Sequence, residues 1–346
     1  MNEFRHQPLY DAWVVIAPNR VKKPGFDPGS PPPPAINDPF ITGQENQTPP
    51  EIYALRENPK IAASWKTRVF ANKFPLLALE SPMQRQKRGF YATQGGFGAH
   101  EMVVDHPKAG KHLCRFGPTE LMSLMQTFRD RIAALYQDGR IASVLAFKNQ
   151  GMKAGNTIPH SHSQVVALPF IAPNLKTQIE TGRDHYRRNE RCLMCDIIQS
   201  EEEDKSRVLM RNRHFIAFAP FAPRFEFEVW IAPLGHESDF TRLGKEGLND
   251  LAEILGWVLA RLGVALEKPD LNLLLFTAPP LRDHAEPGYF HHMNRFFHWH
   301  LELLPRFEGR DGFELSGGCY VNPVPPEDYA AYLRELNLEP DAKEPK

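Results

Sequence analysis

Little in this sequence favours binding to nucleic acid or insertion into a membrane. The 346 residues include 41 basic and 42 acidic side chains, so the formal net charge is −1, and no long basic run occurs. Because nucleic-acid-binding surfaces usually carry an excess of Lys and Arg, that class of protein is disfavoured. No apolar stretch approaches the roughly 20 residues that a membrane-spanning helix requires. We therefore expect no nucleic-acid partner and no membrane insertion.

Cysteine is also scarce, with four residues in the whole chain. Two of them, Cys192 and Cys195, are spaced as Cys-x-x-Cys, whereas Cys114 and Cys319 stand alone. The amino-terminal residues do not resemble a signal peptide, so we expect a cytoplasmic protein, and disulfides are rare in that compartment. In a reducing compartment a Cys-x-x-Cys pair indicates metal binding or redox chemistry rather than a disulfide framework.

Proline is plentiful but unevenly distributed, and many of the 32 prolines crowd into residues 24–50. Such a segment cannot form a regular helix or a central strand, so we expect an extended arm lying over the surface. Elsewhere the composition, with 42% hydrophobic and 24% charged residues, is typical of a globular protein. The length allows two ordinary domains.

The rest of the chain contains the same order of expected elements twice. Each copy has two strands, an amphipathic helix, a third strand and a final strand that carries His-x-His. In the first copy we expect these elements at residues 68–75, 100–104, 118–137, 143–148 and 160–168. In the second copy we expect them at residues 215–220, 225–231, 248–266, 271–276 and 296–305. The repeat predicts an α+β fold of two tandem units, each an antiparallel sheet backed by a helix.

The first His-x-His strand is the most informative segment. His160, His162 and Gln164 occupy alternate positions, so their side chains should project from one face of a strand, with the intervening serines on the other. Three explanations are compatible with this pattern. They are a polar cluster satisfied by backbone groups, a metal site, and a histidine that acts as a nucleophile.

Nucleophilic catalysis would place particular demands on the neighbours of the histidine. A neutral imidazole attacks phosphorus from the ring nitrogen that carries no hydrogen, so the other nitrogen must donate to a fixed acceptor such as a backbone carbonyl. The phosphate oxygens also need donors. Gln164 and the backbone amides of the glycine-containing loop at residues 151–155 could supply them.

The two motifs together resemble a known family. Residues 160–166 (His-Ser-His-Ser-Gln-Val-Val) and 298–304 (His-Trp-His-Leu-Glu-Leu-Leu) are similar to the histidine triad pattern, His-φ-His-φ-His-φ-φ, where φ is apolar. The galactose-1-phosphate uridylyltransferase branch has two such domains and carries Gln as the third motif residue of the first. Residues 13–24, 147–151 and 312–320 also look like elements of that branch, which contains bacterial uridylyltransferases and a plant ADP-glucose phosphorylase. The resemblance spans about residues 8–335.

The resemblance implies two histidine-triad-like domains with different roles. Residues 1–185 would form the catalytic domain with its proline-rich arm, and residues 186–346 a second domain with a zinc site. His162 would be the nucleophile, His160 would orient it through its backbone carbonyl, and Gln164 would hold the α-phosphate. The substrate-binding residues that the resemblance implies are Arg20, Asn72, Asn149, Thr157, Phe313 and Glu314. Taken singly, Arg20, Asn72 and Glu314 are equally compatible with solvated or capping roles.

Metal binding is expected in the second unit. Two thiolates at the Cys192–Cys195 spacing can complete a tetrahedral zinc site with two imidazoles, for which the resemblance implies His236 and His298. The alternatives are thiols without a metal, or a ligand drawn from His284, His291 and His292. Many relatives have Cys-Pro-x-Cys in the amino-terminal arm, whereas this chain has Asp-Pro-Phe-Ile at residues 38–41. We therefore expect one structural zinc per chain.

The function implied by the resemblance is nucleotidyl transfer. A nucleoside monophosphate would pass from a sugar nucleotide to a sugar 1-phosphate through a nucleotidyl-histidine, with UDP-glucose and galactose 1-phosphate as the best-matching pair. One alternative is an ADP-glucose or other NDP-sugar phosphorylase that uses inorganic phosphate. A second, of a different class, is a nucleotide-binding regulatory protein. The resemblance also implies a homodimer.

Overall fold

One large sheet organises the molecule. The computed structural model describes residues 2–7, 12–16, 38–282, 290–307, 309 and 311–338. The sheet has ten strands in the order β10-β11-β12-β14-β13-β8-β9-β7-β4-β3, and every neighbouring pair is antiparallel. The first half of the chain supplies β3 (Glu51–Arg56), β4 (Trp65–Ala71), β7 (Ala99–Val104), β8 (Ser143–Gln150) and β9 (His162–Leu168). The second half supplies β10 (Val208–Arg211), β11 (Phe215–Phe218), β12 (Val229–Pro233), β13 (Leu271–Phe276) and β14 (His300–Pro305).

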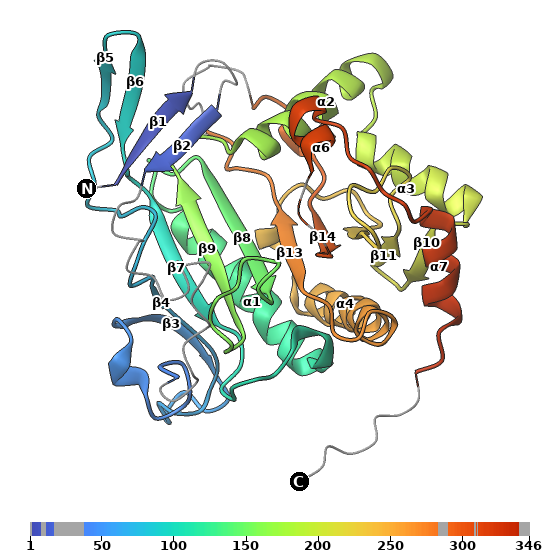
Figure 1. The fold of residues 1–346 in the computed structure, drawn as a ribbon, viewed down its shortest axis with the longest axis horizontal. Helices are drawn as coiled ribbons and strands as arrows, with labels where there is room; N and C mark the ends of the chain where they lie inside the picture. The colour runs from blue at the N-terminus through green and yellow to red at the C-terminus, as the bar shows by residue number, and fades with distance from the viewer. Residues whose placement is uncertain are drawn as a thin grey trace.

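The expected repeat is present, and each copy has one more strand than the sequence predicts, because β3 precedes the first copy and β10 the second. The first half runs β3, β4, β7, α1, β8, β9, and the second runs β10, β11, β12, α4, β13, β14. The strands of each half are adjacent in the sheet, and Figure 1 shows the two halves side by side, blue to green and then yellow to red. The structure adds that the two sheets are one, because β8 pairs with β13 across the junction, with Lys148 opposite Leu273.

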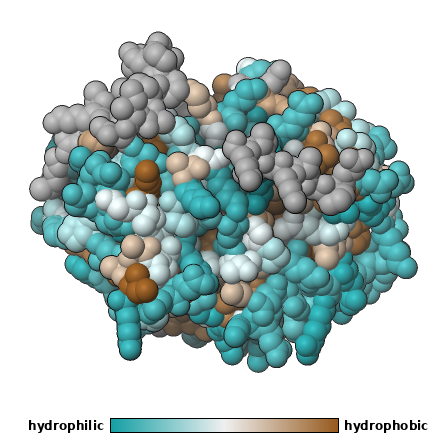
Figure 2. Space-filling model, turned by 90° about the horizontal axis from the view of Figure 1, so that it is seen from below, coloured by the Kyte–Doolittle hydropathy of each residue, from teal (hydrophilic) through white to brown (hydrophobic). Residues whose placement is uncertain are grey.

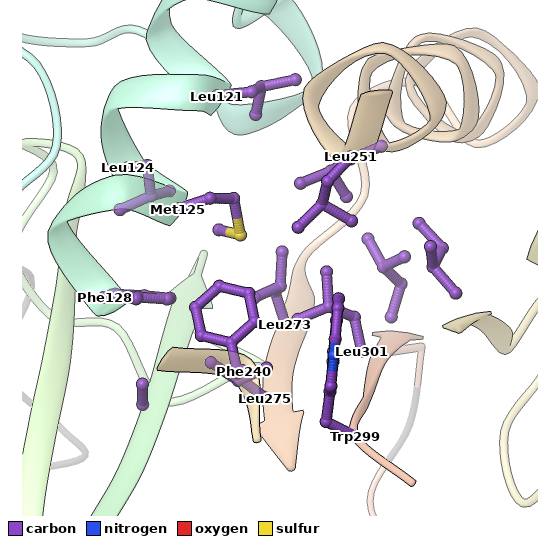
Figure 3. Packing of buried hydrophobic residues seen from close by; sticks show 14 of the residues in the cluster. Leu121, Leu124, Met125, Phe128, Phe240, Leu251, Leu273, Leu275, Trp299 and Leu301 are labelled. Atoms are coloured by element: carbon purple, nitrogen blue, oxygen red, sulfur yellow. The ribbon is translucent and has the colours of Figure 1, made fainter. Parts of the chain in front are cut away.

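Two long helices cover one face of this sheet. α1 (Pro118–Leu135) and α4 (Lys245–Ala265) pack against each other and against strands of both halves. α1 begins where the sequence predicts, because Pro118 fits the first helical position and the Glu120 carboxylate accepts the Gly117 backbone N–H at 2.7 Å. Figure 3 shows the core that results, in which leucines of both helices meet side chains of β13 and β14.

Shorter elements cover parts of the opposite face. The amino-terminal end of α2 (Pro173–Asn189) and the short α5 (Met293–Phe296) pack on Val166 and Leu168 of β9 in a second apolar cluster. A separate sheet of order β2-β1-β6-β5 lies beside the first half, at the upper left of Figure 1. The remaining elements are β1 (Glu3–Gln7), β2 (Ala12–Ile16), β5 (Arg85–Arg88), β6 (Tyr91–Gly95), α3 (Leu193–Asp204), α6 (Gly312–Gly317) and α7 (Pro326–Glu335).

Several expected segments differ from the structure. The strand expected at residues 296–305 begins only at His300, because Met293–Phe296 form α5. The strand expected at residues 225–231 begins only at Val229. The Glu228 carboxylate accepts the backbone N–H of Arg224 and Phe225, and Phe227 adopts a φ of 58°, so this stretch closes a turn instead. Most of the expected arm at residues 24–50 lies outside the described residues. Its last part, residues 38–50, forms turns and one 3₁₀ turn (Glu45–Gln47).

Among the described residues, no helix is long and apolar enough to cross a membrane. On the face seen in Figure 2, hydrophilic residues predominate and hydrophobic ones form small separate patches.

Truncating a core side chain at the junction tests whether the two halves unfold together. Leu273 is fully buried on β13 beneath the two helices. We expect Leu273→Ala to lower the free energy of unfolding by about 3 kcal/mol, because it leaves a cavity, while unfolding in urea stays a single transition. The control Val264→Ala, at a side chain of α4 that is 54% exposed, should change it by less than about 0.5 kcal/mol. Two separate transitions would show that the halves are independent.

Candidate functional site

The first His-x-His motif lies where β9 begins. His162 and Gln164 share the face opposite the two long helices, since Val165 and Ala167, at the odd-numbered positions of the strand, belong to the helix-side core. The expected alternation along this strand is therefore present. His160 comes just before the strand and is buried, as is His162.

One ring nitrogen of His162 is fixed and the other is left free to react. His162 Nδ1 lies 2.8 Å from the backbone carbonyl oxygen of His160, and since a carbonyl only accepts, Nδ1 carries the hydrogen. Nε2 then holds the lone pair of the neutral ring. Burial lowers the pKa of His162 to about 4, so the ring is neutral near pH 7. The edge-on ring of Phe40, with its centroid 5.7 Å away, helps to exclude water.

His160 is held at both ring nitrogens. Its Nδ1 lies 2.6 Å from Asp38 Oδ2, and its Nε2 lies 2.7 Å from the backbone carbonyl oxygen of His106. Asp38 also accepts the backbone N–H of Phe40 at 3.0 Å. The residue that replaces the first cysteine of the relatives' motif is thus bonded directly to His160. The carbonyl that orients His162 belongs to a residue whose side chain cannot turn without breaking two hydrogen bonds.

Gln164 is held by a residue that the sequence analysis missed. His100 on β7 accepts the Leu76 backbone N–H at Nδ1, so its Nε2–H donates to Gln164 Oε1 at 2.8 Å. Asn72, at the end of β4, lies against the same ring, with Nδ2 at 3.1 Å from Nε2. The Gln164 amide nitrogen has no hydrogen-bond partner in the described part of the chain and is the end left to donate. The sequence does contain a signal for His100. It lies two residues before Met102 on β7, the strand beside the motif, so the two side chains are on the same face.

Thr157 and Asn149 lie close to the motif. Thr157 is in the loop before β9, and its buried hydroxyl has no hydrogen-bond partner among the described residues. Asn149 lies on β8, two residues from Phe147, which is opposite Gln164. Its Oδ1 accepts from Asn272 on β13 at 2.9 Å, so it sits at the junction of the two halves.

Three predicted substrate-binding residues are not brought to this site by the described contacts. Arg20 lies outside the described residues. Phe313 and Glu314 lie on the short α6, near the top middle of Figure 1 and away from β9. The Glu314 carboxylate accepts the backbone N–H of Asp311 at 3.0 Å, which is the capping role that the sequence left open.

The second unit contains a candidate metal centre. Cys192, Cys195, His236 and His298 each present a ligand atom, and these atoms lie within 4.8 Å of one another. Cys195 Sγ is 3.4 Å from His236 Nδ1 and 3.5 Å from His298 Nδ1. Tetrahedral Zn²⁺ with ordinary bond lengths to sulfur and nitrogen would separate such atoms by about 3.6 Å. The expected four residues therefore come together with spacing that suits a metal ion.

The surroundings of this cluster also suit a metal. His236 Nε2 donates to the Asn294 carbonyl at 2.9 Å and His298 Nε2 to the Pro233 carbonyl at 3.0 Å, so both Nδ1 atoms face the cluster unprotonated. The hydrogen bond with Cys195 lowers the pKa of Cys192, while the same contact raises the pKa of Cys195. A divalent cation would favour the loss of both thiol protons. His291 and His292 are outside this cluster, and His284 is outside the described residues.

The second His-x-His motif differs in what surrounds its second histidine. His300 Nδ1 lies 3.2 Å from the His298 carbonyl oxygen, as His162 does from that of His160. However, the Phe276 ring stacks on His300 at 5.1 Å, and Trp230 lies on it at 5.6 Å. Glu302, which replaces the third motif histidine, is paired with Arg224. Aromatic rings thus cover the position that corresponds to the nucleophile.

Comparisons with known proteins agree with this geometry. A family model described as galactose-1-phosphate uridyl transferase, N-terminal domain, matches residues 1–172. An ADP-glucose phosphorylase from Arabidopsis thaliana is 32% identical over 97% of this chain and 93% of its own length. The chain belongs to the galactose-1-phosphate uridylyltransferase family. It is an enzyme of the nucleotidyltransferase class.

Other members of the family show how far the similarity extends. A galactose-1-phosphate uridylyltransferase from Thermotoga maritima is 27% identical over 98% of this chain and all of its own length. The solved structure of an Arabidopsis ADP-glucose phosphorylase with bound ADP-glucose has a TM-score of 0.75 and 30% identity, covering 98% of this chain and all of that one. A solved uridylyltransferase with 23% identity and a TM-score of 0.76 shares the fold.

The protonation state of His162 can be measured directly. Because the folded protein depresses its pKa to about 4 from the usual 6.5 or so, we expect the ring to stay neutral, with its hydrogen on Nδ1, from pH 8 down to about 5. Nitrogen-15 NMR of labelled protein reports both, and the signal missing from His162→Asn assigns the resonance. A titration midpoint near 6.5 would contradict the buried, neutral nucleophile.

Proposed function

We propose that the protein is a UDP-glucose:hexose-1-phosphate uridylyltransferase, with galactose 1-phosphate as the acceptor and His162 as the nucleophile. The observation that carries this proposal is the bond from His162 Nδ1 to the His160 carbonyl, which leaves Nε2 as a nucleophile. In this assignment residues 1–185 form the catalytic domain and residues 186–346 the zinc-binding domain.

The reaction would proceed by two displacements at the α-phosphorus. His162 Nε2 forms a bond to phosphorus as the bond to the sugar-phosphate oxygen breaks, and the sugar 1-phosphate leaves. The nucleotidyl-imidazole carries a positive charge, and the Nδ1–H bond to the His160 carbonyl is stronger to this charged ring than to the neutral one. A phosphate oxygen of the acceptor then attacks phosphorus and the P–N bond breaks. Two inversions give net retention.

Donors for the phosphate oxygens would come from side chains around β9. The Gln164 carbonyl is occupied by His100, so its amide nitrogen would donate to the α-phosphate. The orphaned hydroxyl of Thr157 would donate to a phosphate oxygen, which would satisfy a buried group that otherwise lacks a partner. Asn72 and Asn149, on either side of the motif, would contact the nucleotide.

A second candidate function shares the first displacement. The phosphorylase from Arabidopsis is 32% identical to this chain, and its name supports an enzyme that releases a nucleoside diphosphate from ADP-glucose with inorganic phosphate as acceptor. The several relatives named galactose-1-phosphate uridylyltransferase favour the uridylyl transfer. The two activities differ in base and acceptor, not in the role of His162.

A homodimer would complete the assignment of the remaining residues. α6 and the chain after it expose apolar side chains, with Phe313, Leu315 and Val321 each more than half exposed. Exposed apolar groups gathered in one segment are typical of interaction surfaces. A partner subunit would allow Phe313, Glu314 and Arg20 to approach a substrate, which light scattering would test by showing a species of twice the chain mass.

The Cys192, Cys195, His236 and His298 cluster would hold one zinc ion with a structural role. Two thiolates and two imidazoles occupy all four positions of a tetrahedral ion, leaving none for substrate. The ion would tie the start of α3 to the chain just before β14. All four cysteines are free thiols, which agrees with the cytoplasm as the compartment.

The covalent intermediate gives the sharpest test of the mechanism. Incubation with UDP-glucose should add one uridylyl group to the protein, visible by intact-mass spectrometry, because P–N bond formation precedes acceptor attack. The His162→Asn variant should show no adduct while retaining a wild-type melting temperature. Nucleotide binding without an adduct from any sugar nucleotide would favour a nucleotide-binding regulatory protein.

The acceptor separates the two candidate activities. Uridylylated enzyme should lose its adduct on addition of galactose 1-phosphate and yield UDP-galactose. Faster adduct formation from ADP-glucose, with discharge by inorganic phosphate to ADP, would establish the phosphorylase instead.

Metal content tests the second site. We expect elemental analysis of protein purified without added metal to find one zinc per chain, and Cys192→Ser to lose it together with several kcal/mol of stability. Cys319→Ser, which alters an exposed thiol outside the cluster, is the matched control and should keep the zinc. Two zinc ions per chain, or full occupancy in Cys192→Ser, would contradict the assignment.

A further inference from the structure

A lysine with no access to solvent lies beneath the start of β9. Lys148 on β8 is fully buried, and its ammonium has three hydrogen-bond partners. They are Asp105 Oδ2 at 2.7 Å, Ser161 Oγ at 2.8 Å and the backbone carbonyl oxygen of His162 at 3.2 Å. All three donors of the ammonium are therefore used within one small cluster.

This cluster joins three strands at one point. Lys148 comes from β8 and Asp105 follows directly after β7, and these are the two strands that flank β9. The Asp105 backbone N–H donates to the Ser161 carbonyl at 3.1 Å, so the link includes main chain as well as side chains. Lys148 is on the same face of β8 as Val144 and Ala146, which belong to the helix-side core. The His162 ring lies on the other face of the sheet. The ion pair thus crosses under β9 on the side away from the ring.

Stability alone explains this ion pair poorly. Removing two charges from water costs several kcal/mol, and apolar residues of similar volume often serve as well or better. The second carboxylate oxygen of Asp105 is buried and has no hydrogen-bond partner in the described part of the chain, which adds to the cost. What the pair does provide is a fixed location for the main chain at Ser161 and His162.

The two charges also act on the His162 ring. Burial is the first cause of its lowered pKa, the Lys148 charge lowers that pKa further, and the Asp105 charge opposes it. His160, which pairs with Asp38, is a further ionisable group that acts on the ring. His112 lies near Lys148 on the helix side. Among these groups only Lys148 and Asp105 combine opposite charges with hydrogen bonds to the backbone at residues 161–162.

We propose that Lys148 and Asp105 are positioning residues for His162, which clamp the backbone at residues 161–162 so that Nε2 points at the α-phosphorus. The inference rests on the proposed nucleophile and goes beyond it, since neither residue touches substrate. Loss of the clamp should slow the formation of the nucleotidyl-enzyme more than it weakens the binding of the sugar nucleotide.

Single-turnover measurements of adduct formation from UDP-glucose test the clamp in Lys148→Met, in Asp105→Asn and in the double variant. We expect each to lower the rate on the order of 10- to 100-fold, as small misplacements of a reacting group do, with little change in the concentration of half-saturation. The control Lys176→Met removes an exposed ion pair with Glu180 and should react like wild type. Wild-type rates in a folded Lys148→Met protein would overturn the proposal.

The pH dependence separates positioning from a merely structural role. Lys148→Met leaves the Asp105 charge unopposed, so the pKa of His162 should rise and the acid limb of the rate profile should move to higher pH. Asp105→Asn leaves the Lys148 charge and should move that limb to lower pH. In the double variant the limb should lie near that of wild type while the rate stays low. Shifts in the same direction, or none, would count against the clamp.

Titration of the His162 ring, monitored by NMR, reports the same shifts in the pKa of His162 without any substrate. A wild-type protein that forms no adduct would therefore overturn the proposed function, while opposite shifts of the His162 titration in the two single variants would still support the clamp. If Lys148→Met does not fold, the near-isosteric Asp105→Asn variant and its ring titration decide the matter.

Discussion

The antiparallel pairing of β8 with β13 is the interaction on which the rest of the structure depends. It runs from Leu271 opposite Gln150 to Leu275 opposite Ala146, and it turns two five-stranded halves into one sheet. α1 and α4 then lie side by side on one face and fill it with apolar side chains. His162, Gln164 and His100 gather on the opposite face of the sheet.

The two His-x-His strands show one local geometry used in two ways. In each, the second histidine donates from Nδ1 to the carbonyl of the first. What differs is the partner of the first histidine, a carboxylate for His160 and a thiol cluster for His298. The surroundings of the second histidine differ too, because Phe276 stacks on His300, while the Phe40 ring meets His162 edge-on. The two copies therefore share the orientation of the second histidine, and the side chains around each ring differ.

Much of the fold and of the candidate sites could be predicted from the sequence. The helices and His-x-His strands follow from periodicity, and the Cys192–Cys195 pair from its spacing, since both are local patterns. The joining of the two sheets could not be predicted, because no local sequence pattern in β8 or β13 specifies that these two strands pair with each other. Lys148 and His100 were missed as partners of the motif because their contacts join residues 14 and 64 positions apart.

One unsatisfied polar atom, Thr157 Oγ1, agrees with the proposed location of the chemistry. Buried polar groups in native proteins nearly always have partners, and an orphan costs about 1–3 kcal/mol. Thr157 Oγ1, Ser163 Oγ and Asp105 Oδ1 all lack partners in the described part of the chain, and all belong to or flank β9. Ser163 lies on the helix side of β9 with Val165 and Ala167, and Asp105 belongs to the cluster beneath the strand, so neither faces the His162 ring. For Thr157, which precedes the strand on the approach to the motif, a phosphate oxygen is the acceptor that the proposed reaction brings.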